Sequence, residues 1–444
     1  MAEEKRSRTL IEDVRPREAW AWAMYDFANS GYTTVVITAI FNAYFVAVVA
    51  QRAPWATLVW TATLAVSYAL IVLTAPLVGA WADARAAKKR LLAFTTIGCV
   101  LFTAALYFSG PGTLAVAVAC VIASNFFFGT GENLIAAFLP ELANSRAMGR
   151  VSGWGWSLGY LGGLLSLGLC LAWLSQAKAA GRDTAQAVPE TMLITAALFA
   201  VASLPTFLFL RERAVPQAPA DGIVRTAWSR LAATLHHARR FRDLSRFLVC
   251  TLFYQAGIAA VITLAAIYAQ EAMKFTTHDT LVLILVVNLT AACGAFGFGY
   301  VQDRIGHVRA IAATLCSWIL MIVLAWLAEG AALFWVAANV AGLCMGASQS
   351  AGRAMVGYLA PPSRLAEFFG LWGFAVKLAS IFGPLTYGLA NWLSGGNHRQ
   401  AILITGSYFI VGLLLLTGID VKRGRRAALR SDREERATAA RPPA

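Results

Sequence analysis

The strongest constraint on this chain is its series of apolar stretches, which are too long for the core of a water-soluble domain. Residues 31–50, 58–80 and 401–419 are examples. As helices rising about 1.5 Å per residue, such stretches cross about 30 Å of hydrocarbon. Of the 444 residues, 59% are apolar and only 14% are charged, whereas about a quarter of the residues of soluble domains are charged. The sequence therefore predicts an all-α membrane protein.

Twelve membrane-spanning helices are expected, and the basic residues assign their orientation. In this arrangement 30 Lys and Arg residues fall on one side of the membrane, five on the other and two inside spans. Because loops rich in Lys and Arg stay in the cytoplasm, both termini are predicted to be cytoplasmic. This topology explains the net charge of +14 without a nucleic-acid partner. The predicted spans are residues 20–50, 57–82, 91–109, 113–138, 151–175, 190–210, 247–270, 280–301, 310–328, 331–357, 368–393 and 400–419.

The longest loop divides the chain into two sets of six helices. The expected organisation is a cytoplasmic tail, an N-terminal bundle, a cytoplasmic linker, a C-terminal bundle and a basic cytoplasmic tail. Within the linker, Trp228, Leu231 and Leu235 recur at helical spacing among arginines. That pattern indicates an amphipathic helix on the inner membrane surface, and an ordered connector without a regulatory role is the alternative. The five segments are residues 1–19, 20–210, 211–246, 247–419 and 420–444.

A short motif occurs once in each half, after the second and the eighth predicted helix. In both copies a glycine is followed four residues later by an aspartate and then by arginine. Parallel repeats of six helices are the plan of the major facilitator transporters, and the motif resembles the signature of that superfamily. The resemblance implies two pseudosymmetric bundles that alternate access to a central site, with a breakable charge network at the cytoplasmic gate. The motif residues are Gly79, Asp83 and Arg85 in the first half and Gly299, Asp303 and Arg304 in the second.

A narrower resemblance comes from several strings of residues. The segment 22–34 (WAMYDFANSGYTT), the segment 138–143 (FLPELA) and the segment 367–371 (EFFGL) are similar to the vacuole-effluxer family, relatives of the yeast autophagy-related vacuolar amino-acid exporter. Where that family often carries an acid in helix 7, this chain has Gln255. The resemblance implies export of a small polar solute, with an amino acid as the leading expectation. An organic acid, an amine or a drug is the alternative.

Four ionisable residues lie inside predicted spans. They are Asp26 in helix 1, Glu132 in helix 4, Arg353 in helix 10 and Lys377 in helix 11. Each costs about 2.5–3.5 kcal/mol at the centre of a membrane, so each is a functional candidate. Arg353, together with Lys377, could bind a substrate carboxylate, while Asp26 or Glu132 meets an ammonium group or carries a coupling proton.

Glu132 and Arg353 occupy equivalent positions of the repeat, because each lies eight residues before an aligned proline. Equivalent helices face each other across the centre of a pseudosymmetric bundle. Three interpretations stay open for this pair: a substrate site, an inner gate formed by a direct Glu132–Arg353 contact, or a structural role within one half. Tyr25, Asn29 and Gln255 are further candidates for lining the substrate site.

Several function classes lack their sequence signatures. The chain contains no nucleotide-binding P-loop and no cluster of residues at metal-ligand spacing, so an ATP-driven pump, an enzyme, a cofactor and a bound metal are not expected. A non-transporting membrane sensor or assembly factor with the same fold is the alternative from another class. The bias of 30 Arg against 7 Lys favours a bacterial inner membrane. We expect a monomer whose partners are a small-molecule solute and the lipid bilayer.

Overall fold

The computed structural model describes residues 9–215, 241–271, 273–275, 277–395 and 397–439. Within these ranges twelve helices are long and apolar enough to cross a membrane. The prediction of an all-α protein with twelve spans is confirmed. The predicted break between the ninth and tenth spans is also present, because one helix ends at Leu327 and the next begins at Ala331.

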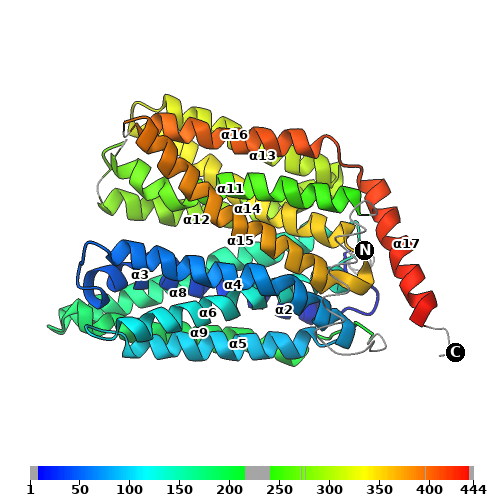
Figure 1. Cartoon of the computed structure of the whole chain (residues 1–444), viewed down its shortest axis with the longest axis horizontal. Helices are drawn as coiled ribbons and strands as arrows, with labels where there is room; N and C mark the ends of the chain where they lie inside the picture. Colours follow the sequence, from blue (N-terminus) through cyan, green and yellow to red (C-terminus); the bar gives the residue numbers. More distant parts are fainter. Residues whose placement is uncertain (1–8, 216–240, 272, 276, 396, 440–444) are drawn as a thin grey trace.

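The first half of the chain folds into one bundle of six spans (Figure 1). The first helix packs against the fifth and sixth spans, the second packs against the fourth, and the third packs against the fourth and sixth. After the first span, α2 (Pro16–Tyr32) with its continuation to Val49, the bundle contains α4 (Ala56–Arg85), α5 (Lys88–Ala105), α6 (Leu114–Ala136), α8 (Met148–Ala179) and α9 (Thr184–Phe209).

The second half repeats this packing pattern helix by helix. Its first helix packs against its fifth and sixth, its second against its fourth, and its third against its fourth and sixth. The two halves meet through their second and fifth spans, because α8 packs on α12 and α4 packs on α15. Pseudosymmetry between two six-helix bundles is thereby confirmed. The second bundle contains α11 (Arg242–Glu271), α12 (Thr277–Ile305), α13 (His307–Leu327), α14 (Ala331–Leu359), α15 (Leu365–Leu393) and α16 (His398–Leu416).

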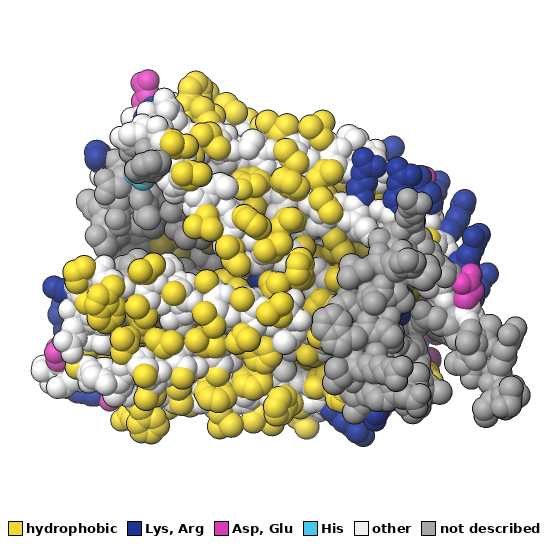
Figure 2. All heavy atoms as spheres, viewed as in Figure 1, with side chains coloured by type: hydrophobic (Ala, Val, Ile, Leu, Met, Phe, Trp, Pro, Cys, Tyr) yellow, Lys and Arg dark blue, Asp and Glu magenta, His cyan; other side chains and the backbone are white. Residues whose placement is uncertain are grey.

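The surface around the helices is apolar. Large aliphatic and aromatic side chains point outward along the spans, among them Leu58, Leu73, Phe94 and Leu208. Figure 2 shows hydrophobic side chains distributed over both bundles. Such a surface is stable against lipid and costly in water, which agrees with a protein embedded in a bilayer.

The first span is not a regular α-helix over its whole length. The α-helix α2 ends at Tyr32 and is followed by π-helical turns over Thr33–Ala39 (η1) and Phe45–Val49 (η2), separated by α3 (Phe41–Tyr44). The sequence predicted one uninterrupted helix over residues 20–50. The difference begins at the polar pair Thr33 and Thr34, which is followed by the β-branched residues Val35, Val36 and Ile37, residue types that favour the α-helix less.

Both ends of the described chain lie at the same end of the bundle, which we call the termini end (Figure 1). Beyond α16, residues expected only to be a basic tail form a further helix, α17 (Val421–Ala439). It is attached to the second bundle by an ion pair of 2.6 Å between Arg423 and Asp243. The amphipathic helix predicted around Trp228 lies outside the described residues.

Candidate functional site

At the termini end, the first copy of the glycine–aspartate motif joins the two halves. The backbone N–H of Glu367, in the first turn of α15, donates to Asp83 Oδ2 at 2.9 Å. Gly79 permits this approach, because a side chain there would overlap with the backbone at Ala366. The first-turn N–H groups of a helix have no partner within the helix and carry partial positive charge. Asp83 therefore caps a helix of the opposite bundle.

The second copy makes the symmetric contact. Asp303 accepts hydrogen bonds from the backbone N–H groups of Gly149 (3.0 Å) and Arg150 (3.2 Å) in the first turn of α8. Gly299 approaches the backbone of Gly149 so closely that a side chain would not fit. The Arg150 side chain adds an ion pair of 3.5 Å with Asp303. Each half thus caps the fifth span of the other half.

The arginines of the motif are placed differently from its aspartates. Arg85 and Arg304 are exposed at the termini end, whereas the aspartates of the motif contact backbone N–H groups across the interface. The expected part of these two arginines in a charge network at the gate stays a prediction. Arg85 and Arg304 lie at the ends of α4 and α12, on the protein surface.

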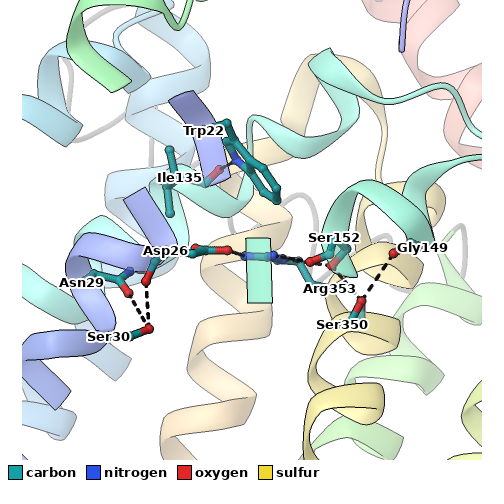
Figure 3. A network of polar contacts seen from close by, with 9 residues as sticks. All are labelled: Trp22, Asp26, Asn29, Ser30, Ile135, Gly149, Ser152, Ser350 and Arg353. Carbon is teal, nitrogen blue, oxygen red and sulfur yellow. Dashed lines mark hydrogen bonds and ion pairs between the residues drawn. The ribbon is translucent and has the colours of Figure 1, made fainter. Parts of the chain in front are cut away.

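Deeper between the halves, Arg353 of α14 inserts into a pocket made by the first half (Figure 3). Its Nη1 donates to Asp26 Oδ2 at 2.6 Å, its Nε donates to Ser152 Oγ at 3.1 Å and its Nη2 donates to the Ser152 carbonyl at 2.8 Å. Asp26 belongs to α2 and Ser152 to α8. The guanidinium therefore joins one helix of the second half to two helices of the first.

Aromatic rings cover the same guanidinium. Arg353 Cζ lies 4.6 Å from the ring centroid of Trp22 and 5.4 Å from that of Trp156. Trp22 is fixed in turn by a hydrogen bond of 2.8 Å from its Nε1 to the Ile135 carbonyl. Gly155 leaves the required space, because a methyl group there would overlap with Asp26, Arg353 and Trp22. The pocket is fitted to a charged guanidinium, with an acid, a carbonyl and two ring faces.

A second ion pair crosses the interface. Lys377 of α15 donates from Nζ to Glu132 Oε2 of α6 at 3.1 Å. The Nζ atom also lies 5.7 Å from the ring centroid of Tyr68 and 5.6 Å from that of Phe128. In this pair 12% of the Lys377 side chain and 27% of the Glu132 side chain are exposed, against 3% for Arg353 and 10% for Asp26. The second pair is therefore the more accessible one.

These contacts change the expected partners. The repeat suggested a direct contact between Glu132 and Arg353, whereas the structure pairs Arg353 with Asp26 and Glu132 with Lys377. Equivalent depth in two halves does not fix the direction in which a side chain leaves its helix. The two positive and two negative side chains inside the spans nonetheless each contact a partner of opposite sign. Such pairing lowers the cost of burying a charge.

The remaining candidates lie around these pairs. Tyr25 donates or accepts a hydrogen bond of 2.8 Å with Thr96, and its ring packs on Phe199 and Phe207, so it points into the first bundle rather than toward the second. Asn29 is buried one turn after Asp26. Gln255 of α11 donates a hydrogen bond of 2.7 Å to Gln349 of α14, which joins two helices within the second half.

Sequence reasoning did not single out Tyr68, Ser152 and Trp156 as site residues. Ser152 and Trp156 flank Gly155 on the glycine-rich helix α8, so the glycine spacing could have indicated a close contact there. Tyr68 lies in the middle of a span predicted from hydropathy. A tyrosine at that depth could have indicated a site residue, because most tyrosines of membrane helices lie near the interfaces.

Comparison with solved structures shows which fold the chain shares. The human organic anion transporter MFSD10 (TETRAN) superposes with a TM-score of 0.70 at 16% identity, covering 91% of this chain and 100% of that one. The major facilitator transporter FucP in the outward conformation gives 0.70 at 14% identity, covering 91% and 98%. The fold, with twelve spans in two equivalent halves, is the one that these major facilitator transporters share.

The sequence places the chain in a particular family. Residues 56–429 match the family described as "Vacuole effluxer Atg22 like", and the chain belongs to it. It is 26% identical over 402 residues to the uncharacterized MFS-type transporter YxiO of Bacillus subtilis, covering 89% of this chain and 93% of that protein. It is also 24% identical over 333 residues to autophagy-related protein 22-1 of Aspergillus fumigatus. That match covers 68% of this chain and 54% of the fungal protein, so the chain spans about half the length of this relative.

Proposed function

We propose that the protein exports amino acids by alternating access, with protons as the coupling ion. The proposal rests on the two ion pairs that connect the halves. One of them is enclosed and the other is partly exposed. A zwitterion needs a site that offers both signs of charge, and the interface offers both. The family's description as a vacuole effluxer agrees with export.

The enclosed pair of Asp26 and Arg353 acts as the gate at the termini end. Three hydrogen bonds from Arg353 cross from the second half to the first. For the halves to separate at this end, the guanidinium has to leave its pocket. The hydrogen bonds of the two helix caps, made by Asp83 and Asp303, also have to break. Breaking a buried ion pair costs about 3–5 kcal/mol when one charge stays unpaired, so the gate opens when another interaction offsets that cost.

A proton supplies part of this compensation. When Arg353 withdraws, Asp26 is left as a carboxylate among buried side chains, and protonation removes the isolated charge. This makes Asp26 the coupling acid and links opening at the termini end to proton uptake. The more accessible pair of Glu132 and Lys377 binds the solute. Asn29 lies one turn along α2 from Asp26 and completes the polar surface beside it.

The membrane context belongs to the same proposal. We place both termini in the cytoplasm of a bacterial cell with the protein in the inner membrane, since 30 Lys and Arg residues lie on the termini side of the predicted spans and five on the other. Figure 2 shows basic side chains gathered at the termini end. In this orientation the structure is closed toward the cytoplasm. Residues 20–210 and 247–419 are then the two moving bundles of a monomer.

Efflux from proteoliposomes tests the function. Vesicles containing the full chain are preloaded with amino acids, amines, sugars and organic acids, and mass spectrometry follows their loss with and without a pH gradient. Selective loss of amino acids, accelerated by the gradient and reduced in R353A, is the expected result. Selective loss of organic acids or amines instead would replace the solute class. No loss beyond that of protein-free vesicles, from protein shown to be folded and inserted, would favour a sensor or assembly factor.

A further inference from the structure

The surroundings of Lys377 have the composition of a binding site for an ammonium ion. Tyr68 on α4 and Phe128 and Glu132 on α6 form what we call the ammonium cage. Two ring faces lie 5.7 Å and 5.6 Å from Lys377 Nζ, and the Glu132 carboxylate lies 3.1 Å from it. Aromatic faces next to an acid are a common way to hold an ammonium group. All three cage residues belong to the first half, and the cation comes from the second.

The occupant of the cage is held less firmly than the guanidinium of Arg353. Lys377 reaches the cage at the end of a flexible four-carbon stem and contacts Glu132 through a hydrogen bond of 3.1 Å, whereas Arg353 donates three hydrogen bonds to the first half. The Glu132 side chain is also 27% exposed. A primary ammonium is a compact charge that can be exchanged for another of the same shape.

We propose that the ammonium cage binds the ammonium group of the transported solute, and that the ammonium group of Lys377 occupies the cage when no solute is bound. The inference rests on the proposed transport function and names the chemistry of its binding site. An incoming primary ammonium displaces Lys377, and the released lysine pairs with the carboxylate of the same solute. No charge is left without a partner at any stage of this exchange.

The exchange also determines specificity. A simple amine would displace Lys377 and leave that ammonium unpaired, and a simple carboxylate would draw Lys377 away and leave Glu132 unpaired. Each therefore bears an electrostatic penalty that a zwitterion avoids. Lys377 is thus a specificity-determining residue. Its removal should turn a site for zwitterions into a site for amines.

Three solutes of matched shape provide the test: L-leucine, isopentylamine, which lacks its carboxylate, and isocaproate, which lacks its amino group. Their binding to the purified full chain is measured by calorimetry for wild type, K377M and K377Q. We expect both variants to bind isopentylamine about tenfold more tightly, because the cage is vacant, and to bind L-leucine and isocaproate more weakly. K178M removes an exposed lysine of α8 and should leave all three affinities unchanged.

A second set of variants locates the bound amine. Adding Y68L or E132Q to K377M should remove the gain in isopentylamine binding, while Y68F in the same background should keep it, since the ring face remains. Unchanged or weaker amine binding in both K377M and K377Q, with unaltered thermal unfolding, overturns the inference. A gain that survives Y68L and E132Q also overturns it, because the amine then binds elsewhere.

The proposed transport function and the proposed ammonium cage can be contradicted independently of each other. If wild-type vesicles export amino acids but K377M and K377Q gain no affinity for the amine, the cage proposal is wrong and the transport function stands. If the variants gain affinity for the amine while no amino acid leaves wild-type vesicles, the cage is a ligand site in a protein that does not export amino acids.

Discussion

The two ion pairs between the halves use similar chemistry in different surroundings. Arg353 and Asp26 are enclosed by two tryptophans and the backbone of α8, whereas Lys377 and Glu132 lie against two rings and remain partly exposed. Enclosure makes a charge pair costly to break, and partial exposure makes it exchangeable. This difference supports our proposal that the enclosed pair holds the halves together and that the open pair binds a solute.

The largest expected effect comes from breaking the enclosed pair. R353M leaves the Asp26 carboxylate buried without its guanidinium, which costs about 3–5 kcal/mol. We expect transport to fall by about a hundredfold or more and the thermal unfolding midpoint to drop. Efflux assays and unfolding followed by tryptophan fluorescence measure both. Wild-type transport by R353M would show that the enclosed pair is not needed for the cycle.

Double-mutant cycles then compare the two pairs directly. The cycle of D26N with R353M should give a coupling free energy of about 3 kcal/mol, and the cycle of E132Q with K377M about 1 kcal/mol or less. Unfolding in a detergent titration supplies the free energies. A cross-cycle of E132Q with R353M serves as the control, because these two residues have other partners. Strong coupling in the cross-cycle would restore the Glu132–Arg353 gate.

The fit of the enclosed pocket can be altered without removing a charge. In G155A the new methyl group overlaps with Asp26, Arg353 and Trp22, and overpacking of this kind costs about 1–3 kcal/mol. We expect faster hydrogen–deuterium exchange in the first turns of α8 and in the last turns of α14. G168A is the matched control on the same helix, because a methyl group there meets no atom within 4 Å. Equal exchange in the two variants would contradict a tightly fitted pocket.

The smallest effects are expected at the helix caps. D83A and D303A each remove a cap across the interface, with an expected cost of about 0.5–2 kcal/mol. Because the two caps are symmetric, the losses should be similar and the double variant additive. R85Q and R304Q change exposed side chains and should shift the unfolding midpoint little. A much larger loss of stability on replacing one of the two aspartates would show that the two caps do not contribute equally to the contact at the termini end.

Most of the fold could be predicted from the sequence, because the membrane imposes simple rules. An apolar stretch must be long enough to cross, and every backbone group must be paired within a helix. The motif shared by Gly79 and Gly299 identified the repeat, and the two contacts of these glycines prove symmetric. The extra helix α17 carries too much charge for a hydropathy pattern, so it was predicted only as a tail.

The site was predicted in part. Asp26, Glu132, Arg353 and Lys377 were identified because charge inside a span is costly, and all four lie between the halves. Their partners were not, because spacing gives the depth of a residue but not its direction around the helix. Tyr25 illustrates the same limit: it neighbours Asp26 in sequence, but its hydroxyl bonds to Thr96 within the first half.

The wide turns of the first span have a practical consequence for mapping by cysteine scanning. In η1 and η2 the backbone bonds reach five residues back, as from Ile40 to Val35 and from Ala50 to Phe45, instead of the four of an α-helix. Thr33 and Thr38 are joined in the same way through the Thr38 hydroxyl. Labelling along this stretch should therefore recur at a longer interval than in α2, and a wheel drawn with the usual period would assign its residues to the wrong side of the helix.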